Sequence, residues 1–344
     1  MGHINARAGR RRAKWKGRSA LIGVVGLVAV LLSACSGGNP GSLSGGLSAQ
    51  SQSPGEQPFT LGAVSSISNL VWEYAKGQGY YSDQGLDLKI ATADSGPALV
   101  TGVINGTYDV STLAALPALV AISKGADLRI FNATSEVAPR HGTSGVLVAA
   151  KSSITSYKDL VGKTVATNAL TSLNVLVTKM AVKAAGGDPS GIKFVALPFK
   201  SSLQAVAQGQ VDAAVVITPF ITQGEEAGLR NIGDPTADAL QEGTSYNVVI
   251  TSGKTAQNKA AAIKGFNQAS DKAVDKLVAD PDMIRSLAQT ESIGVSKNDA
   301  EKMDLPDLSS KPVDVAKLQA LADAAQQYGF IASKLDVSKY VITP

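Results

Sequence analysis

The hydrophobic positions of this 344-residue chain recur with two periods that alternate along the sequence. Short apolar runs are typical of buried strands, whereas apolar positions spaced three and four apart indicate helices. The first half contains predicted strands at 59–64, 86–93, the start of 110–125, 128–134 and 145–150. Helical patterns separate the first four of these strands. This order predicts a parallel, doubly wound sheet with helices on both faces.

A second cycle of the same kind follows. It contains a short helix and a strand in 156–167, a helix over 172–187, a strand at 192–199, a helix at 201–212, and strands at 213–220 and 246–252. The remainder is mainly helical, over 259–280, 282–291 and 313–329. About 286 residues lie between Phe59 and the end of the chain. That length is large for one core, so we expect two α/β lobes.

The uncharged apolar stretch over 20–32 does not belong to this pattern. Its 13 residues are too few to span a bilayer comfortably, which takes roughly 20. Only basic charges precede it, at Arg7, Arg10, Arg11, Arg12, Lys14, Lys16 and Arg18. A basic segment, a short apolar core and small residues before a cleavage point are typical of a secretory signal peptide, which we expect over 1–34. The arginine pairs leave both the general and the twin-arginine export routes open.

The apolar stretch ends in Leu32-Ser33-Ala34-Cys35, which contains the one cysteine of the chain. This tetrapeptide resembles the bacterial lipobox. The resemblance implies cleavage before Cys35 and lipidation of its thiol, palmitate being among the attached acyl chains. The alternative is an uncleaved anchor with an incidental cysteine. The Ser-, Gly- and Pro-rich residues that follow cannot bury enough apolar surface to offset their ordering entropy, so we expect a flexible tether over 35–58.

The charge balance changes once the signal peptide is set aside. The whole chain has 32 basic and 28 acidic residues, and removal of seven basic ones leaves 25 against 28, a net charge of −3. The basic character therefore belongs mostly to the export signal. It gives no support to nucleic-acid binding.

Four segments resemble a known family when they are taken in order. They are GYYSDQGLDLKI, then SGPALVTGVINGTYDV, then SSITSYKDLVGKTVAT, and finally LQAVAQGQVDAAVVITPF. Their order and spacing resemble the solute-binding lipoproteins of ABC importers, in the nitrate/sulfonate/taurine and thiamine-precursor branch. The resemblance covers residues 59–342.

This resemblance implies a two-lobed periplasmic-binding-protein type II fold, in which each lobe is a doubly wound, mostly parallel sheet. Lobe one is expected over 59–145 and 249–344, and lobe two over 146–248. A ligand would be trapped between the lobes by hinge closure. The implied partners are a small-molecule ligand, an ABC permease and its ATPase, and the membrane through the N-terminal lipid. The protein is expected to act as a monomer at the outer face of the bacterial cell membrane.

Ligands of open α/β sheets lie beyond the carboxyl ends of the strands, where helices begin. Unpaired N–H groups and the positive ends of the helix dipoles face the ligand there. Taking each predicted strand end in turn gives the candidate ligand-binding residues Ser65, Ser66, Ser68, Asn69, Ser95, Gly96, Thr112, Leu113, Ala114, Ser135, Glu136, Arg140, Asn168, Thr171, Ser172, Asn174, Thr218, Pro219 and Tyr246. These mostly neutral donors favour a small organic anion of the sulfonate, nitrate or taurine kind, or else a polar neutral solute. No carboxylate cluster suggests a divalent metal ion.

Each candidate also has a plainer interpretation. Ser, Thr and Asn at helix starts commonly serve as ordinary N-caps. Arg140 suits a forked contact with an oxyanion, or is simply a solvated loop residue. Glu136 suits an amino group of the ligand, or is a surface carboxylate, and His141 is expected to be polar surface. Trp72, Tyr80 and Tyr81 are expected to pack at the end of the first helix.

An enzyme of the same fold is the main alternative class. Thiamine-pyrimidine biosynthetic proteins belong to a related branch, and the resemblance implies that their chemistry needs histidine and a cysteine-rich iron-binding motif. After Cys35 this chain has His141 as its single histidine and no further cysteine. Walker A, G-x-S-x-G and dinucleotide-binding motifs are missing from the sequence, and the S-x-x-K match at Ser190–Lys193 is best explained by chance. We therefore expect no catalysis, no cofactor and no catalytic residue. A lipid-anchored sensor or hydrolase is the remaining alternative.

Overall fold

The computed structural model describes residues 55–138, 144–290, 295–303, 305 and 308–344. The predicted signal peptide, Cys35 and nearly all of the predicted tether lie outside these residues, as do Arg140 and His141. No helix in the described ranges combines the length and the apolar character needed to cross a bilayer.

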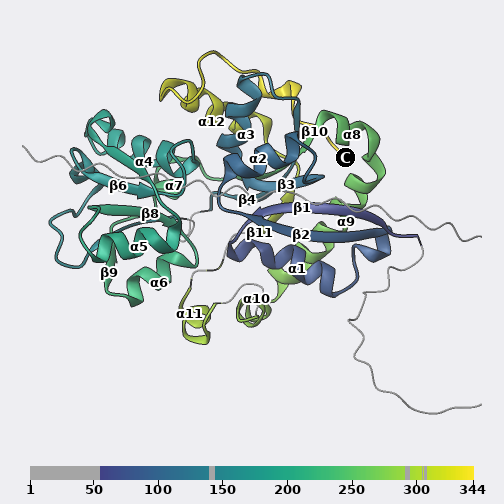
Figure 1. Ribbon diagram of the computed structural model, residues 1–344, viewed down its shortest axis with the longest axis horizontal. Helices are drawn as coiled ribbons and strands as arrows, with labels where there is room; N and C mark the ends of the chain where they lie inside the picture. The colour runs from purple at the N-terminus through teal and green to yellow at the C-terminus, as the bar shows by residue number, and fades with distance from the viewer. Residues whose placement is uncertain (1–54, 139–143, 291–294, 304, 306–307) are drawn as a thin grey trace, which may run out of the picture. The chain divides into compact units, whose positions relative to one another are not determined.

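The described chain forms two β-sheets with helices packed on both faces of each (Figure 1). The first sheet has the strand order β11-β4-β10-β3-β1-β2. Its strands are β1 (Gln57–Val64), β2 (Leu86–Ala93), β3 (Val110–Ala114), β4 (Leu128–Glu136), β10 (Ser245–Ser252) and β11 (Leu308–Lys311). The helices of this lobe are α1 (Leu70–Gly77, preceded by the 3₁₀ turn Ile67–Asn69), α2 (Gly96–Ile104), α3 (Ala115–Ser123), α8 (Gly253–Asn258), α9 (Ala260–Ala279), α10 (Pro281–Ala288), α11 (Lys297–Lys302) and α12 (Val315–Gln327).

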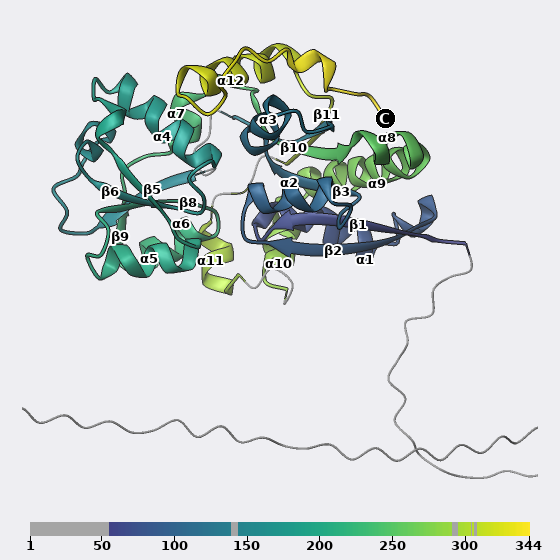
Figure 2. The same ribbon diagram turned by 45° about the horizontal axis from the view of Figure 1, so that its top comes forward.

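The second sheet has the order β7-β6-β8-β5-β9. Its strands are β5 (Ser144–Ala149), β6 (Thr164–Thr167), β7 (Lys193–Ala196), β8 (Ala213–Ile217) and β9 (Leu229–Asn231). The helices of this lobe are α4 (Leu173–Ala184), α5 (Phe199–Ala207), α6 (Phe220–Glu226) and α7 (Pro235–Ala239). Figure 2 shows this group beside the first one. The predicted α/β architecture with two sheets is confirmed.

Most strands run in one direction, and the exceptions are the strands that connect the lobes or close an edge. In the first sheet β1 pairs with β2 and β3 in parallel, while β10 is antiparallel to both β3 and β4. In the second sheet β6 is parallel to β7 and β8, while β5 is antiparallel to β8. The predicted lobe boundaries at 145/146 and 248/249 fall inside β5 and β10. Each of these two strands pairs within a single sheet.

Both faces of each sheet are buried, which explains why the strands read as nearly continuous apolar runs. Alternate side chains of a strand point to opposite faces. Val248 and Ile250 of β10 pack against α2, α3 and α12, whereas Val249 packs against α1 and α9. In the second sheet the side chains of Val146 and Leu147 likewise belong to two different core clusters.

The aromatic residues of the first helix pack as predicted. Trp72 is 2% exposed and Tyr81 is 1% exposed. The ring of Tyr81 stacks on Phe266 of α9, and its hydroxyl hydrogen-bonds Ser270 at 3.0 Å. Burial raises the pKa of the Tyr81 phenol well above its usual value, so this hydroxyl stays neutral. The Tyr80 ring lies edge-on to Tyr74.

Each lobe contains the same pair of hydrogen bonds between a strand threonine and an aspartate in a helix–strand turn. The amide N–H of Thr60 in β1 donates to the Asp109 carboxylate at 2.9 Å, and the Asp109 N–H donates back to the Thr60 carbonyl at 2.9 Å. In the second lobe Thr164 of β6 and Asp212 repeat this pair, at 2.7 and 2.9 Å. A glycine with positive φ precedes each aspartate by three residues, Gly106 at 78° and Gly209 at 68°. The two Gly-x-x-Asp segments of the sequence therefore fasten a helix–strand turn to the start of the neighbouring parallel strand.

We expect Asp212→Ala to lower the free energy of unfolding by about 1–3 kcal/mol, because the Thr164 N–H then loses a charged acceptor. Asp212→Asn keeps an acceptor oxygen and should cost less. Urea unfolding of both variants measures the difference, with the exposed Asp94→Ala as a control. Equal stabilities of the Asp212→Ala and Asp94→Ala variants would show that the closing bond is unimportant.

Candidate ligand-binding site

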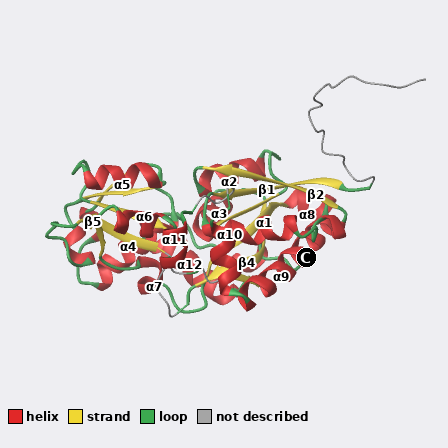
Figure 3. Ribbon diagram, turned by 90° about the horizontal axis from the view of Figure 1, so that it is seen from below, coloured by secondary structure: helices red, strands yellow, loops and turns green. Residues whose placement is uncertain are grey.

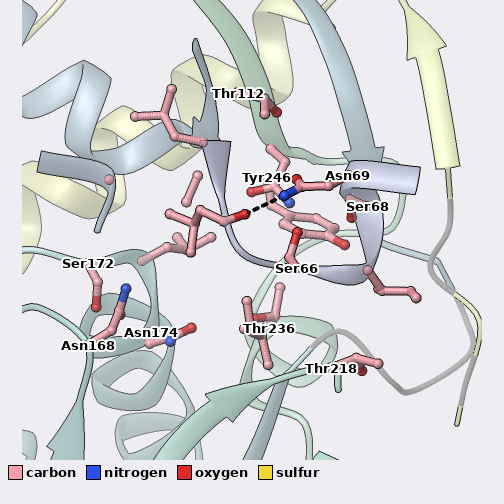
Figure 4. Close-up of a pocket in the computed structure, with 18 of the residues that line it drawn as sticks. Ser66, Ser68, Asn69, Thr112, Asn168, Ser172, Asn174, Thr218, Thr236 and Tyr246 are labelled. Atoms are coloured by element: carbon pink, nitrogen blue, oxygen red, sulfur yellow. Dashed lines mark hydrogen bonds between the residues drawn. The ribbon is translucent and has the colours of Figure 1, made fainter. Parts of the chain in front are cut away.

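A cavity of about 1090 Å³, open solvent at its mouth included, lies between the two sheets (Figure 4). Residues of both lobes line it. They are Val64, Ser66, Ile67, Ser68, Asn69, Trp72, Gly96, Thr112, Leu113, Ala114, Pro117, Asn168, Ser172, Leu173, Asn174, Phe199, Ile217, Thr218, Thr236, Tyr246, Asn247 and Leu305. The figure shows Ser66, Ser68 and Asn69 of the first lobe across the space from Asn168, Ser172 and Asn174 of the second.

Apart from the start of α7, which contributes Thr236, six helix starts border this cavity, three from each lobe. Each of them follows the carboxyl end of a strand, because a parallel strand leads directly into its crossover helix. Strands β1, β2 and β3 lead into the turn before α1, into α2 and into α3, and strands β6, β7 and β8 lead into α4, α5 and α6. The first N–H groups of a helix have no partner within the helix. The cavity is therefore surrounded by backbone donors.

Side chains leave these helix starts uncapped. Ser66, Ser95 and Ser172 occupy N-cap positions with extended backbone, yet none of their hydroxyl groups accepts a hydrogen bond from its own helix. The N-caps Ala114, Pro198 and Pro219 of α3, α5 and α6 have no side-chain cap either. By contrast α8, α10, α11 and α12, none of which lines the cavity, are capped by the side chains of Ser252, Asp280, Ser296 and Asp314. The ordinary capping interpretation of the predicted serines thus does not apply at the cavity.

The part of the lining that the structure describes is uncharged. None of the described residues that border the cavity is Asp, Glu, Lys or Arg. Its polar side chains are hydroxyls and amides, and Trp72, Phe199 and Tyr246 add aromatic surface. Several polar groups are held by neighbours: Asn69 Nδ2 donates to the Val64 carbonyl at 3.1 Å, and Ser172 Oγ lies 3.1 Å from Thr167 Oγ1. Among the described residues, the helix ends are therefore the groups that favour negative charge in the cavity.

Asn168, directly after β6, has a side-chain oxygen that is buried and makes no hydrogen bond within the described residues. A buried acceptor of this kind costs about 1–3 kcal/mol if it stays unpaired. Since Asn168 lines the cavity, its amide group is placed to be satisfied by a bound molecule.

A buried network holds Thr236 against the cavity. The Asp234 carboxylate accepts hydrogen bonds from the Thr236 N–H at 2.9 Å and the Ala237 N–H at 3.1 Å, so it caps α7. The Ser144 hydroxyl lies 2.7 Å from this carboxylate and 2.8 Å from Thr236 Oγ1. Asp234 and Ser144 are 3% and 1% exposed. The first residue of β5 and the start of α7 therefore position Thr236 together.

The structure brings twelve of the predicted residues to the cavity wall: Ser66, Ser68, Asn69, Gly96, Thr112, Leu113, Ala114, Asn168, Ser172, Asn174, Thr218 and Tyr246. It places six others elsewhere, namely Ser65, Ser95, Ser135, Glu136, Thr171 and Pro219. Ser65 and Thr171 are exposed, Ser135 is fully buried in β4, and Glu136 pairs with Lys311 at 3.5 Å. Arg140 lies outside the described residues.

Sequence reasoning missed ten lining residues: Val64, Ile67, Trp72, Pro117, Leu173, Phe199, Ile217, Thr236, Asn247 and Leu305. The sequence predicts only a packing role for Trp72, but this side chain is both buried and part of the cavity wall. Asp234 followed by Pro235 is a sequence pattern typical of a helix start, and Thr236 is the next residue of that helix. Leu305 carries no local signal, because it reaches the cavity from a distant part of the chain. Among the described residues, no three His, Cys, Asp or Glu side chains gather closely enough to hold a metal ion.

We expect Ser66→Ala to change the free energy of unfolding by less than about 0.5 kcal/mol, because Ser66 does not cap its helix. Ser252 is the matched control, since its hydroxyl accepts from the Thr255 N–H at 3.0 Å. Ser252→Ala should cost about 1 kcal/mol. Thermal unfolding of the two variants makes the comparison. An equal loss at both positions would restore the capping interpretation for Ser66.

Comparisons with known proteins agree with this geometry. A curated relative from Brachyspira hyodysenteriae, named "Putative ABC transporter periplasmic binding protein", is 24% identical over 273 residues, which cover 75% of this chain and 73% of the relative. The alkanesulfonate-binding protein SsuA from Xanthomonas axonopodis pv. citri, solved with bound MOPS, superposes with a TM-score of 0.72 at 19% identity. That match covers 86% of this chain and all of the SsuA chain.

The periplasmic aliphatic sulphonate binding protein SsuA from Escherichia coli gives a TM-score of 0.68 at 21% identity, over 85% of this chain and 93% of the other. At these identities the solved structures establish the fold. The family model described as "NMT1/THI5 like" matches residues 71–284, more than half of the chain. The protein therefore belongs to the NMT1/THI5-like family and has a periplasmic-binding-protein fold.

Proposed function

We propose that this protein is the extracytoplasmic solute-binding lipoprotein of an ABC importer and that it captures a small organic anion between its lobes. One observation carries the ligand class: six helix starts without side-chain caps border a cavity whose described lining residues are uncharged. Backbone N–H groups at helix starts favour negative charge. The names of the sulfonate-binding structural neighbours support the same class.

Capture follows from the way the chain joins the lobes. It leaves the first sheet after β4, forms the second lobe, and returns through β10. Rotation about these two passages would bring Asn168, Ser172 and Asn174 toward Ser66 and Asn69. A permease and its ATPase would then recognise the closed form. Binding is proposed in preference to catalysis, since after Cys35 the chain has one histidine and no cysteine.

A thiamine-precursor pyrimidine is the second candidate ligand. The aromatic surfaces of Trp72, Phe199 and Tyr246 favour it, because a flat ring can stack on such faces. The two candidates differ in charge and can be separated by a direct screen.

We expect organic anions to raise the melting temperature of the soluble 36–344 fragment. A ligand at 100 times its Kd stabilises the folded state by about 2.7 kcal/mol. The screen compares ethanesulfonate, taurine, nitrate and a hydroxymethylpyrimidine with matched chloride salts. Stabilisation by the pyrimidine alone would favour the second candidate. Stabilisation by cations or apolar compounds alone would refute the anion proposal.

Attachment to the membrane is proposed through Cys35. The lipobox-like Leu32-Ser33-Ala34-Cys35 and the tether that follows support this step. Acyl chains on the cysteine would hold the two lobes at the membrane surface within reach of a permease.

We expect cells that express the full chain to incorporate labelled palmitate into it and to retain it in the membrane fraction. Cys35→Ser should abolish the label and release the protein. Ser36→Ala, at the next residue, is the control and should leave both properties unchanged. Unlabelled parent protein in the membrane fraction would instead support the uncleaved anchor.

A further inference from the structure

A polar contact joins two segments that lie far apart in the sequence, the end of α6 in the second lobe and α11 of the C-terminal region. Lys302 Nζ lies 3.3 Å from Glu226 Oε1, and the Asn298 side-chain amide donates to the same oxygen. Figures 1 and 2 show α11 between the two groups of elements, beside α6. Two side chains of α11 thus contact one carboxylate of α6.

Helix α11 is fastened to the first lobe. Arg285 of α10 donates from Nη1 to the carbonyls of Ala300 at 2.5 Å, Glu301 at 3.1 Å and Met303 at 3.0 Å. A cation at these carbonyls suits the C-terminal end of a helix. Ala300 and Met303 are 0% and 1% exposed, and they belong to the core cluster that contains Trp72. A movement of the second lobe would therefore break the contact at Glu226 before it detached α11 from α10.

The same segment reaches the cavity. Leu305, three residues beyond Lys302, lines the wall. Further on, Leu308 pairs with Ser135 of β4, next to the passage between the lobes. Helix α11 therefore lies between α6 and a residue of the binding cavity.

Apolar contact joins the lobes elsewhere. Leu173, Leu176 and Val177 of α4 belong to the core cluster built around α3 and α12. Figure 1 shows α4 and α12 toward the top of the molecule and α6 and α11 toward the bottom. Figure 3 shows α11 between the lobes from below. The apolar contact of α4 with the cluster around α3 and α12 is hard to separate. The small polar contact at Glu226 is therefore the one that can break and form again.

The charges at the contact are finely balanced. The Asp299 side chain lies beside Glu226 and raises the pKa of its carboxyl group, burial adds to this rise, and Lys302 opposes it. Asp299 is only 6% exposed, and one of its oxygens makes no hydrogen bond within the described residues. Two neighbouring carboxylates repel each other, so Lys302 and Asn298 are needed to hold Glu226 in place.

We infer that Glu226 is a positioning residue for ligand capture, which holds the second lobe to α11 and so limits how far the cleft can open, with Leu305 at its wall. This role does not depend on which ligand the cavity binds. Control of the cleft between the lobes is thus assigned to Glu226, which does not itself border the cavity.

Spin labels on the two lobes test this role without a ligand. The labels are attached through Lys76→Cys in α1 and Lys200→Cys in α5, both exposed positions, in the full chain carrying Cys35→Ser. Pulsed electron–electron double resonance measures the distance between them. We expect Glu226→Ala to increase the population at longer distances roughly two- to five-fold, the range for loss of an exposed polar contact. Lys302→Met should act in the same direction.

Glu301→Ala is the matched control. Glu301 lies on the same helix, and its exposed side chain pairs with Lys297 of that helix at 3.9 Å. It should leave the distances unchanged. The inference is overturned if Glu226→Ala and Lys302→Met both match the parent, or if Glu301→Ala shifts the distances as much as they do. A failed ligand screen would leave this result unaffected, so the two proposals fail separately.

Discussion

The unpaired N–H groups at the starts of crossover helices are the constraint on which the site depends. Parallel strands of one sheet end at a common edge, so their helices must begin there, and each start leaves donors without partners. In this protein two such edges face each other. Elsewhere in the described chain serine and aspartate side chains satisfy most of the helix starts. At the cavity only α7 has such a cap, from Asp234, and at the six other helix starts the donors are available to a ligand.

Helix ends as anion donors have consequences for selectivity. Their effect acts mainly at short range and within the first turn of the helix. Shape, aromatic surface and lobe closure then decide which anion fits. Trp72, Thr236 and Leu305 reach the cavity from three distant parts of the chain. Discrimination among ligands therefore depends on how the lobes come together.

The sequence predicts the elements that both faces of a sheet bury, because such strands are apolar throughout. The strand 86–93 matches β2 residue for residue, and the helix 259–280 differs from α9 by one residue at each end. Strand ends also locate the serines and asparagines at the cavity. Short elements such as β9, α11 and β11 escape this reasoning, since three to six residues carry too little periodicity. Ser135 lies away from the cavity wall because β4 extends past residue 134 and buries it inside the sheet.

The place of β10 in the first sheet sets the order in which the molecule can be assembled. Because β10 lies between β3 and β4, the first sheet cannot connect these two strands before β10, which ends at residue 252, has been added. The outer strand β11, which ends at residue 311, is added later still. The second sheet uses only 144–231, one continuous stretch. The second lobe can therefore fold first as a unit of short-range contacts, while the first lobe remains a split sheet with open edges. Completion of the first sheet is the step that brings the helix starts of the two lobes to opposite sides of the cavity.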